Sequence, residues 1–260
     1  MSDYRPYPVR DPVKNYFPAP NSIFDYGMKP GEIALYLYLL YRMDLDSFQC
    51  APSRAEIAKA LCCSESSVRN YTRALVGRRL LAAERRTTRT KNGRQRNDTL
   101  IYTLQPLAGM GDWKWKDAAP LRHSLYDWSV RYKPSGIRNY FLLPNELFHL
   151  QLRPGAIATY ACLLRFENRE TYRCYPKQKT IADCIGAGRD AVAEYVRELS
   201  KRRLIETEPT LVRNHLGAYW NGSLLYFIRP IQEAIDYQWQ LQCERNEMLQ
   251  RQERFEKCLA

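Results

Sequence analysis

The chain has 260 residues and a formal net charge of +12. This basic balance favours a polyanionic partner, with nucleic acid first and a membrane surface second. The sequence has no apolar run of about 18 residues that would span a bilayer, and its first residues lack the apolar core of a signal peptide. We therefore expect a cytoplasmic protein that has no membrane partner and whose eight cysteines are reduced.

Residues 1–14 are rich in proline and charge, and we expect no fixed structure there. Arg5, Arg10 and Lys14 give this segment the character of a flexible basic arm that can follow DNA, whereas a plain disordered terminus is the simpler alternative. The first folded unit is expected to begin at residue 15.

Residues 30–81 carry the pattern of one helix followed by a helix-turn-helix. Pro30-Gly31-Glu32 opens a helix whose apolar residues recur at helical spacing. In residues 54–61 the apolar side chains again share one face, and Ser64 is a suitable N-cap for a second helix that ends at Gly77. That second helix has an apolar stripe on one face and hydrogen-bond donors on the opposite face, which is typical of a helix that reads the major groove. The donors are Ser66, Ser67, Arg69, Asn70 and Arg73.

Two short segments with strand character follow, Leu80–Glu84 and Asp98–Leu104, with an Asn-Gly turn signal between them. Helix, helix-turn-helix and hairpin together predict a winged helix over residues 15–104. The hairpin is strongly basic, and we favour contact with the DNA backbone over a merely solvated face. Its basic residues are Arg85, Arg86, Arg89, Lys91, Arg94 and Arg96.

The chain then repeats itself at a spacing of 124 residues without a gap. Asn15-Tyr16-Phe17 aligns with Asn139-Tyr140-Phe141, and the identities at core spacing continue to Tyr102 and Tyr226. A repeat of this length is a duplicated domain and too long for a solenoid unit. We therefore predict two domains, 15–104 and 139–228, each with its own core and joined by a linker at 105–138.

The second copy has a different surface. Its reading helix is expected at Arg189–Leu199, where acids have entered the outward face, and its hairpin has Arg213 as the one fixed cation. Residues 15–104 carry 14 Lys or Arg against 8 Asp or Glu, whereas residues 139–228 carry 12 against 9. We therefore expect the first domain to be the main DNA binder. Weaker contacts are assigned to Arg189, Arg197 and Arg213, and the apolar second wing is assigned to protein contact or a homodimer.

Residues 229–260 form a polar, glutamine-rich tail that we expect to be helical. Ala234, Leu241, Met248 and Phe255 are seven residues apart, but the positions between them are polar, so the heptad pattern is poor. A helix docked on the second domain and a weak dimerisation helix are equal alternatives. A solvated charged helix is the third.

The sequence gives little support for a catalytic function, a metal site or a cofactor site. None of the cysteines forms a CxxC pair and the chain has three histidines, so no zinc site is expected. Cys50 and Cys174 are equivalent in the repeat, which favours a packing role. The sequence lacks a GxxxxGK[ST] phosphate loop and a His-x-His pair. We expect no catalytic residue, no metal and no cofactor.

A family resemblance rests on PNSIF, PGEIALYLYLLYRMD and CAPSRAEIAKALCCSESSVRNYTRALVGRRLL, and in the second copy on PNELF, PGAIATYACLLRF and CYPKQKTIADCIGAGRDAVAEYVRELSKRRLI. Each copy resembles the winged helix-turn-helix domains of bacterial plasmids, phages and integrative elements. The first copy is also similar to the N-terminal domain of plasmid replication initiators. The resemblance implies a mainly α fold with small β wings (α+β) that binds double-stranded DNA. Gly188 replaces the capping serine, which sets the second copy apart.

Three functions follow from this reading. The first is a sequence-specific transcriptional regulator. The second is a replication initiator that binds origin repeats, with the tandem winged helices imitating a dimer whose reading helices lie about one helical turn apart. The third is a protein-interaction scaffold that has lost DNA binding, against which the basic first wing argues.

Overall fold

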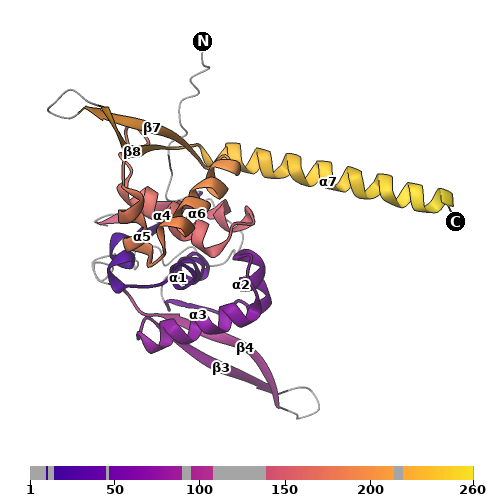
Figure 1. Cartoon of the computed structure of the whole chain (residues 1–260). Helices are drawn as coiled ribbons and strands as arrows, with labels where there is room; N and C mark the ends of the chain where they lie inside the picture. Colours follow the sequence, from indigo (N-terminus) through magenta and orange to yellow (C-terminus); the bar gives the residue numbers. More distant parts are fainter. Residues whose placement is uncertain are drawn as a thin grey trace.

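The computed structural model of the chain describes residue 10 and residues 15–44, 47–89, 95–107, 139–213 and 219–259. Helices and short antiparallel strands make up the fold, which is mainly α with small β wings, as predicted (Figure 1). The first half contains β1 (Tyr16–Pro20), the 3-10 helix η1 (Asn21–Tyr26), α1 (Pro30–Arg42), β2 (Gln49–Cys50), α2 (Arg54–Ala60), α3 (Glu65–Gly77), β3 (Leu81–Arg89) and β4 (Gln95–Leu104). The second half contains β5 (Tyr140–Pro144), η4 (Asn145–His149), α4 (Pro154–Phe166), β6 (Arg173–Cys174), α5 (Gln178–Ile185), α6 (Arg189–Lys201), β7 (Ile205–Arg213) and β8 (Tyr219–Ile228), before α7 (Ile231–Leu259).

The helix-turn-helix of the first half forms where the sequence predicts it. Ser53 caps α2 in a capping box, because its Oγ accepts the Glu56 N–H at 3.1 Å while the Glu56 carboxylate accepts the Ser53 N–H at 2.7 Å. Ser64 caps α3 by accepting the Ser67 N–H at 3.1 Å. In the second half Gly188 caps α6 without a side-chain hydrogen bond. Helix α3 therefore begins at the predicted cap, Ser64, and α6 begins after Gly188, which takes the equivalent position.

Each half carries a three-stranded antiparallel sheet, ordered β2-β4-β3 and β6-β8-β7. The hairpins β3–β4 and β7–β8 form the wings, which extend in opposite directions from the body (Figure 1). The first wing is longer than predicted, because β3 runs to Arg89 and β4 starts at Gln95. The predicted Asn92-Gly93 turn lies outside the described residues.

The two halves are joined by a sheet of their own. Strand β1 pairs antiparallel with β5, and Pro18 faces Leu142, its own equivalent in the repeat. The hydrogen bonds at the two ends of this pair are reciprocal, since Asn21 N–H donates to Asn139 O and Asn145 N–H donates to Asn15 O, each at 2.9 Å. Equivalent residues exchange the same contacts, so the halves are related by a pseudo-two-fold axis.

One continuous core lies across this axis. Helices α1 and α4 pack on each other, and α3 and α6 pack on their outer sides. The ring centroids of Phe17 and Phe148 are 6.2 Å apart and those of the equivalent pair Phe24 and Phe141 are 5.9 Å apart. The buried apolar residues of both halves belong to one cluster. The expectation of two separately buried cores is therefore wrong.

Arg10 does not belong to a DNA-binding arm. Both of its terminal guanidinium nitrogens donate to the carboxylate of Glu167 in the second half, and the guanidinium lies 5.0 Å from the ring centre of Tyr172. The Glu167 side chain is 1 % exposed. Burial opposes the charge of Arg10, but the bond to Glu167 raises its pKa. Arg10 ties the start of the chain to the second half, whereas Arg5 and Lys14 lie outside the described residues.

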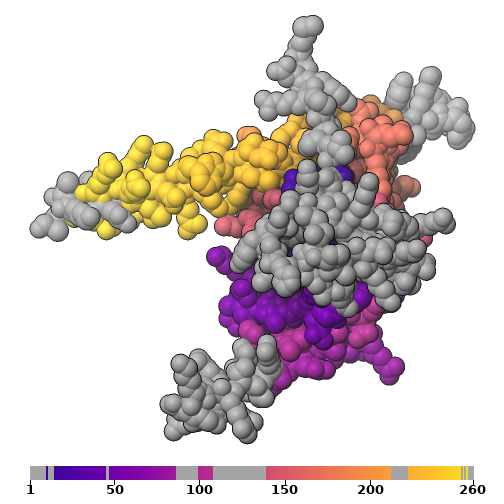
Figure 2. Space-filling view, turned by 180° about the vertical axis from the view of Figure 1, so that it is seen from behind, coloured from indigo at the N-terminus to yellow at the C-terminus, as the bar shows by residue number. Residues whose placement is uncertain are grey.

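Helix α7 combines two of the alternatives for the tail, a helix docked on the second half and a solvated helix. Its first turns dock on the second half, where Ile231, Ala234 and Gln238 are buried. Arg202 donates to the Gln238 amide oxygen, and the Arg203 guanidinium lies 4.5 Å from the ring centre of Tyr237. The rest of α7 projects away from both halves (Figures 1 and 2). Within the described ranges, no helix combines the length and the apolar character needed to cross a bilayer.

Candidate nucleic-acid interface

The outward face of α3 is open to a ligand. Val68 and Leu75 are buried on its inner side, whereas Arg69, Asn70 and Arg73 are exposed. Within the part of the chain that the structure describes, these three side chains make no hydrogen bond or ion pair with the protein. Their donors therefore remain available for an external acceptor such as a base edge or a phosphate.

The two predicted serines have a different local role. The Ser64 hydroxyl lies 2.7 Å from Ser66 Oγ and 2.9 Å from Ser67 Oγ, so the three hydroxyls form one cluster at the start of α3. Ser66 is exposed and Ser67 is half-buried. These hydroxyls stabilise the N-terminus of the helix, and a contact with DNA would have to compete with this cluster.

Helix α3 is fixed to the body at two points. The Tyr71 ring lies against Gly31 in α1, in the space that a Cβ at Gly31 would occupy. At the other end, Arg78 Nε donates to the Glu32 carboxylate at 3.1 Å, and its two terminal nitrogens donate to the carbonyls of Tyr26 and Gly27, each at 3.0 Å. Sequence reasoning missed Arg78, although its recurrence as Arg202 in the second copy was a signal.

The basic wing lies next to α3 in the chain and in space, with β3 packed on α3 (Figure 1). Arg85 on β3 is exposed. The side chains of Arg86, Arg89 and Arg96 and the whole of Lys91 and Arg94 lie outside the described residues. The structure therefore places the strands of the wing beside the reading helix and describes one of its six cations.

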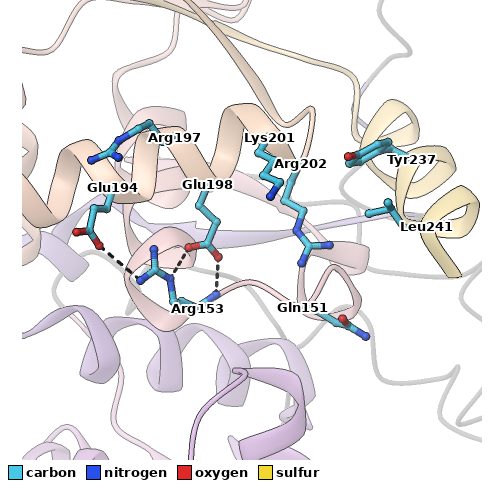
Figure 3. A pocket seen from close by; sticks show the side chains of 9 residues that line it. All are labelled: Gln151, Arg153, Glu194, Arg197, Glu198, Lys201, Arg202, Tyr237 and Leu241. Carbon is cyan, nitrogen blue, oxygen red and sulfur yellow. Dashed lines mark hydrogen bonds and ion pairs between the residues drawn. The ribbon is translucent and has the colours of Figure 1, made fainter. Parts of the chain in front are cut away.

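Two acids of α6 contact an arginine of their own half. Arg153, which precedes α4, binds Glu198 through its Nε at 2.6 Å and through its backbone N–H at 2.9 Å, and its guanidinium lies 3.6 Å from Glu194 (Figure 3). The hydrogen bond that Arg153 donates to Glu198 raises the pKa of Arg153. Glu194 and Glu198 are thus paired within their own half, whereas Asp190 in the first turn of α6 is exposed.

The weaker DNA contacts predicted on the second half are only partly placed. Arg189 and Arg197 are exposed on α6, and Arg197 Nε donates to the Ala193 carbonyl at 3.3 Å on its own helix. The side chain of Arg213 lies outside the described residues. Lys201, one turn after Arg197, is also exposed and was missed by sequence reasoning.

A cavity of about 710 Å³ opens beside α6. The start of α4 and the first turns of α7 form its other walls (Figure 3). The lining residues are Gln151, Arg153, Glu194, Arg197, Glu198, Lys201, Arg202, Tyr237 and Leu241. Four cations against two carboxylates make the opening basic, which suits an anionic ligand.

The cysteines mostly behave as packing residues. Burial raises the pKa of Cys50 and of Cys174 to about 12, so both thiols stay protonated at neutral pH. Cys162 is buried against Cys184, and their hydrogen bond raises the pKa of Cys162 and lowers that of Cys184 to about 7. Across the described residues, no group of three His, Cys, Asp or Glu side chains is placed to hold a metal ion.

Comparison with known proteins bears on the second half. Residues 150–205 match a family model described as a helix-turn-helix domain. This segment runs from the residue after η4, through α4, α5 and α6, to the first residue of β7. Such a domain indicates DNA binding, and here it lies in the copy whose surface is the less basic of the two. No curated protein matches the chain.

Proposed function

We propose that the protein is a sequence-specific double-stranded DNA-binding protein of the bacterial transcription-regulator type, built from two winged helix-turn-helix units. The observation that carries the proposal is the outward face of α3. Arg69, Asn70 and Arg73 are exposed there without partners among the described residues, on a helix that Tyr71 and Arg78 hold in place. A fixed helix with free donors is what major-groove reading requires.

In this proposal α3 supplies the specificity and the first wing supplies affinity. Bidentate arginine–guanine and asparagine–adenine pairs each discriminate by about 1–3 kcal/mol. The cations of the wing contact phosphates, which fixes the register of the protein without reading the sequence. Arg189, Arg197 and Lys201 add weaker backbone contacts from α6.

The packing of the helices limits how the two reading helices can contact one duplex. Helices α3, α1, α4 and α6 pack in series. With about 8–10 Å for each helix–helix contact, the axes of α3 and α6 are at most about 30 Å apart. Successive major grooves of straight DNA are about 34–36 Å apart. The expected separation of one full helical turn is therefore not reached, and both helices can read only if the DNA bends.

A replication initiator is the second candidate, because the pseudo-two-fold axis places two helix-turn-helix units in one chain. Such a chain can occupy a two-part site without a partner. Direct repeats near the coding region would favour initiation, and an inverted repeat over a promoter would favour regulation.

We also propose that the second wing, where Leu211 is 67 % exposed, serves protein contact.

The first test is selection of bound sequences from a random DNA duplex library. We expect one strong motif whose enrichment is lost in Arg69→Ala and Asn70→Ala and kept in Arg189→Ala, the matched change on α6. Two half-sites of equal strength would contradict the leading role of α3. A failure to enrich any motif, together with steep salt dependence of binding, would contradict sequence-specific recognition.

A further inference from the structure

The distal part of α7 projects from the body (Figure 1). Packing on the described residues of the body does not explain the length of this helix. Within residues 242–256, every side chain whose exposure the structure describes is exposed. The local contacts are few, such as Gln240 to Glu244 at 3.0 Å and Gln252 to Glu256 at 3.3 Å. A helix without tertiary packing is only marginally stable in water. The projecting segment therefore calls for a partner.

The face of α7 that would receive a partner continues the face by which α7 docks. Ile231, Ala234 and Gln238 are buried against the second half. Continuing at spacings of three and four residues, the same stripe passes through Leu241, Arg245, Met248 and Gln252. Met248 is 63 % exposed, and Leu249 beside it is 50 % exposed. Along the stripe, Leu241 is thus half-buried where α7 leaves the body, and Met248 is exposed beyond it.

The charges of this segment restrict the kind of partner. Residues 242–259 carry four Glu and four Lys or Arg. A neutral helix has no general attraction for a polyanion, and two copies do not repel each other. Glu244 and Arg251 lie on the same flank of the stripe, seven residues apart. In coiled coils, residues at such flanking positions set the partner and its orientation.

We propose that α7 pairs in an antiparallel arrangement with α7 of a second copy of this chain. In the register that places Arg245 opposite Met248 of the second copy, Leu241 lies opposite Gln252. Glu244 then faces Arg251 of the second copy, and Arg251 faces its Glu244. A parallel pair would instead place the two Arg245 side chains against each other, which is unfavourable. The charge pattern therefore selects the antiparallel pair.

This arrangement separates two DNA-binding bodies to opposite ends of a helix pair. It also brings the end of the second copy's helix to Tyr237 and Leu241, which form one wall of the cavity beside α6. The seam is short and each of its layers contains a polar side chain, so the association is weak and belongs to the lower range of interface sizes. It does not depend on DNA binding.

The test uses the full chain in sedimentation equilibrium without DNA. Glu244→Arg alone and Arg251→Glu alone each place like charges opposite each other twice, and each is expected to weaken self-association about tenfold or more. An equimolar mixture of the two variants restores both ion pairs and is expected to associate like the wild type. Arg254→Glu, the same charge change away from the stripe, is the control and is expected to have no effect.

The mixture distinguishes this pairing from a simple loss of helix structure. A variant that merely unfolds α7 would not regain association in the mixture, and far-UV circular dichroism checks the helix content directly. A wild-type chain that stays monomeric up to about 100 μM, or a mixture that stays dissociated, would overturn the proposal. An effect of Arg254→Glu as large as that of Arg251→Glu would do the same.

Discussion

At the scale of single residues, the same contact fixes both reading helices. Tyr71 of α3 lies on Gly31 of α1, and Tyr195 of α6 lies on Gly155 of α4. In both places a Cβ on the glycine would overlap the tyrosine ring. Glycine is needed here for close approach and not for an unusual backbone angle, because neither residue has a positive φ. The repeated Gly and Tyr are thus two parts of one contact.

The contact predicts the effect of Gly31→Ala. The added methyl forces Tyr71 and α3 away from α1, and overpacking of this kind costs about 1–3 kcal/mol. Urea denaturation should show a lower midpoint, and DNA affinity should fall because α3 shifts. Gly77→Ala is the matched control: a Cβ there meets no atom within 4 Å, so stability should stay or rise by up to about 1 kcal/mol. Equal midpoints for the two variants would contradict the contact.

Sequence reasoning was accurate for residues whose role is local. It correctly placed Ser64 as a cap, and the apolar stripe that it expected on the second helix supplies the buried Val68 and Leu75. It failed for Arg10 and gave no role to Arg153, because their partners Glu167 and Glu198 are distant in the chain. A charged side chain with a distant partner looks the same in sequence as one in solvent.

At the scale of elements, the start of α2 depends on an ionised group. The Ser53 backbone N–H and then its hydroxyl lower the pKa of Glu56 from its ordinary value. A carboxyl whose pKa is lower in the folded state contributes stability above its unfolded pKa and loses it as the pH falls through the folded value. This contribution to stability should therefore be lost below about pH 4.5, which is the ordinary pKa of a glutamate side chain.

Glu56→Gln tests this contribution, because glutamine can keep the capping hydrogen bond without the charge. The difference in urea midpoint between wild type and variant should shrink on going from pH 7 to pH 3. Glu65→Gln in the first turn of α3 is the control, since the Glu65 side chain accepts no hydrogen bond among the described residues. A pH-independent difference for Glu56→Gln would show that its charge is irrelevant.

The first wing makes a prediction about salt. Replacing Arg85, Arg86, Arg89 and Arg94 with Ala should weaken binding to all DNA sequences and flatten the dependence of log affinity on log salt. That slope should change by about 0.9 for each phosphate that is no longer bound. Arg213→Ala in the second wing should do much less in the same fluorescence-anisotropy titration. Equal changes per arginine in the two wings would contradict the asymmetry between the halves.

The helices were predicted better than the strands, for a physical reason. An amphipathic helix shows its period and its caps in the sequence, and α3 begins and ends as expected. The wing strands continue beyond the predicted ends because β3 and β4 remain paired to Arg89 and Gln95. These outer residues are polar on both faces, so no alternation of apolar side chains reveals them.

At the scale of the whole molecule, the shared core predicts a single unfolding event. Phe148 packs on Phe17, Tyr38 and Tyr41 of the other half. Phe148→Ala should cost about 3–5 kcal/mol. Hydrogen exchange should accelerate together in α2–α3 and in α5–α6, although the change lies in one half. Leu211→Ala, at an exposed site, should leave exchange unchanged. Faster exchange in the second half alone would mean that the halves unfold separately.

The packing of the two halves on each other could not be predicted from the sequence. Strand β1 contains Pro18 and Pro20, which argue against a strand, and its partner β5 lies beyond a long linking segment. A repeat in sequence shows that two units have the same fold but not whether they touch. The reciprocal contacts of Asn21 and Asn145 become visible only when the two copies are placed together.

The pseudo-two-fold axis within one chain also changes how the protein responds to dilution. A pair of separate subunits falls apart at low concentration and then loses its two-part site. Here the second unit is always present at a high effective concentration, so occupancy of a two-part site should follow a simple hyperbola even at very low protein levels. In a homodimer every substitution is present in both subunits. In this chain a substitution changes one unit and leaves the other as it was. One wing can therefore remain basic while the other exposes Leu211, and the common core is kept.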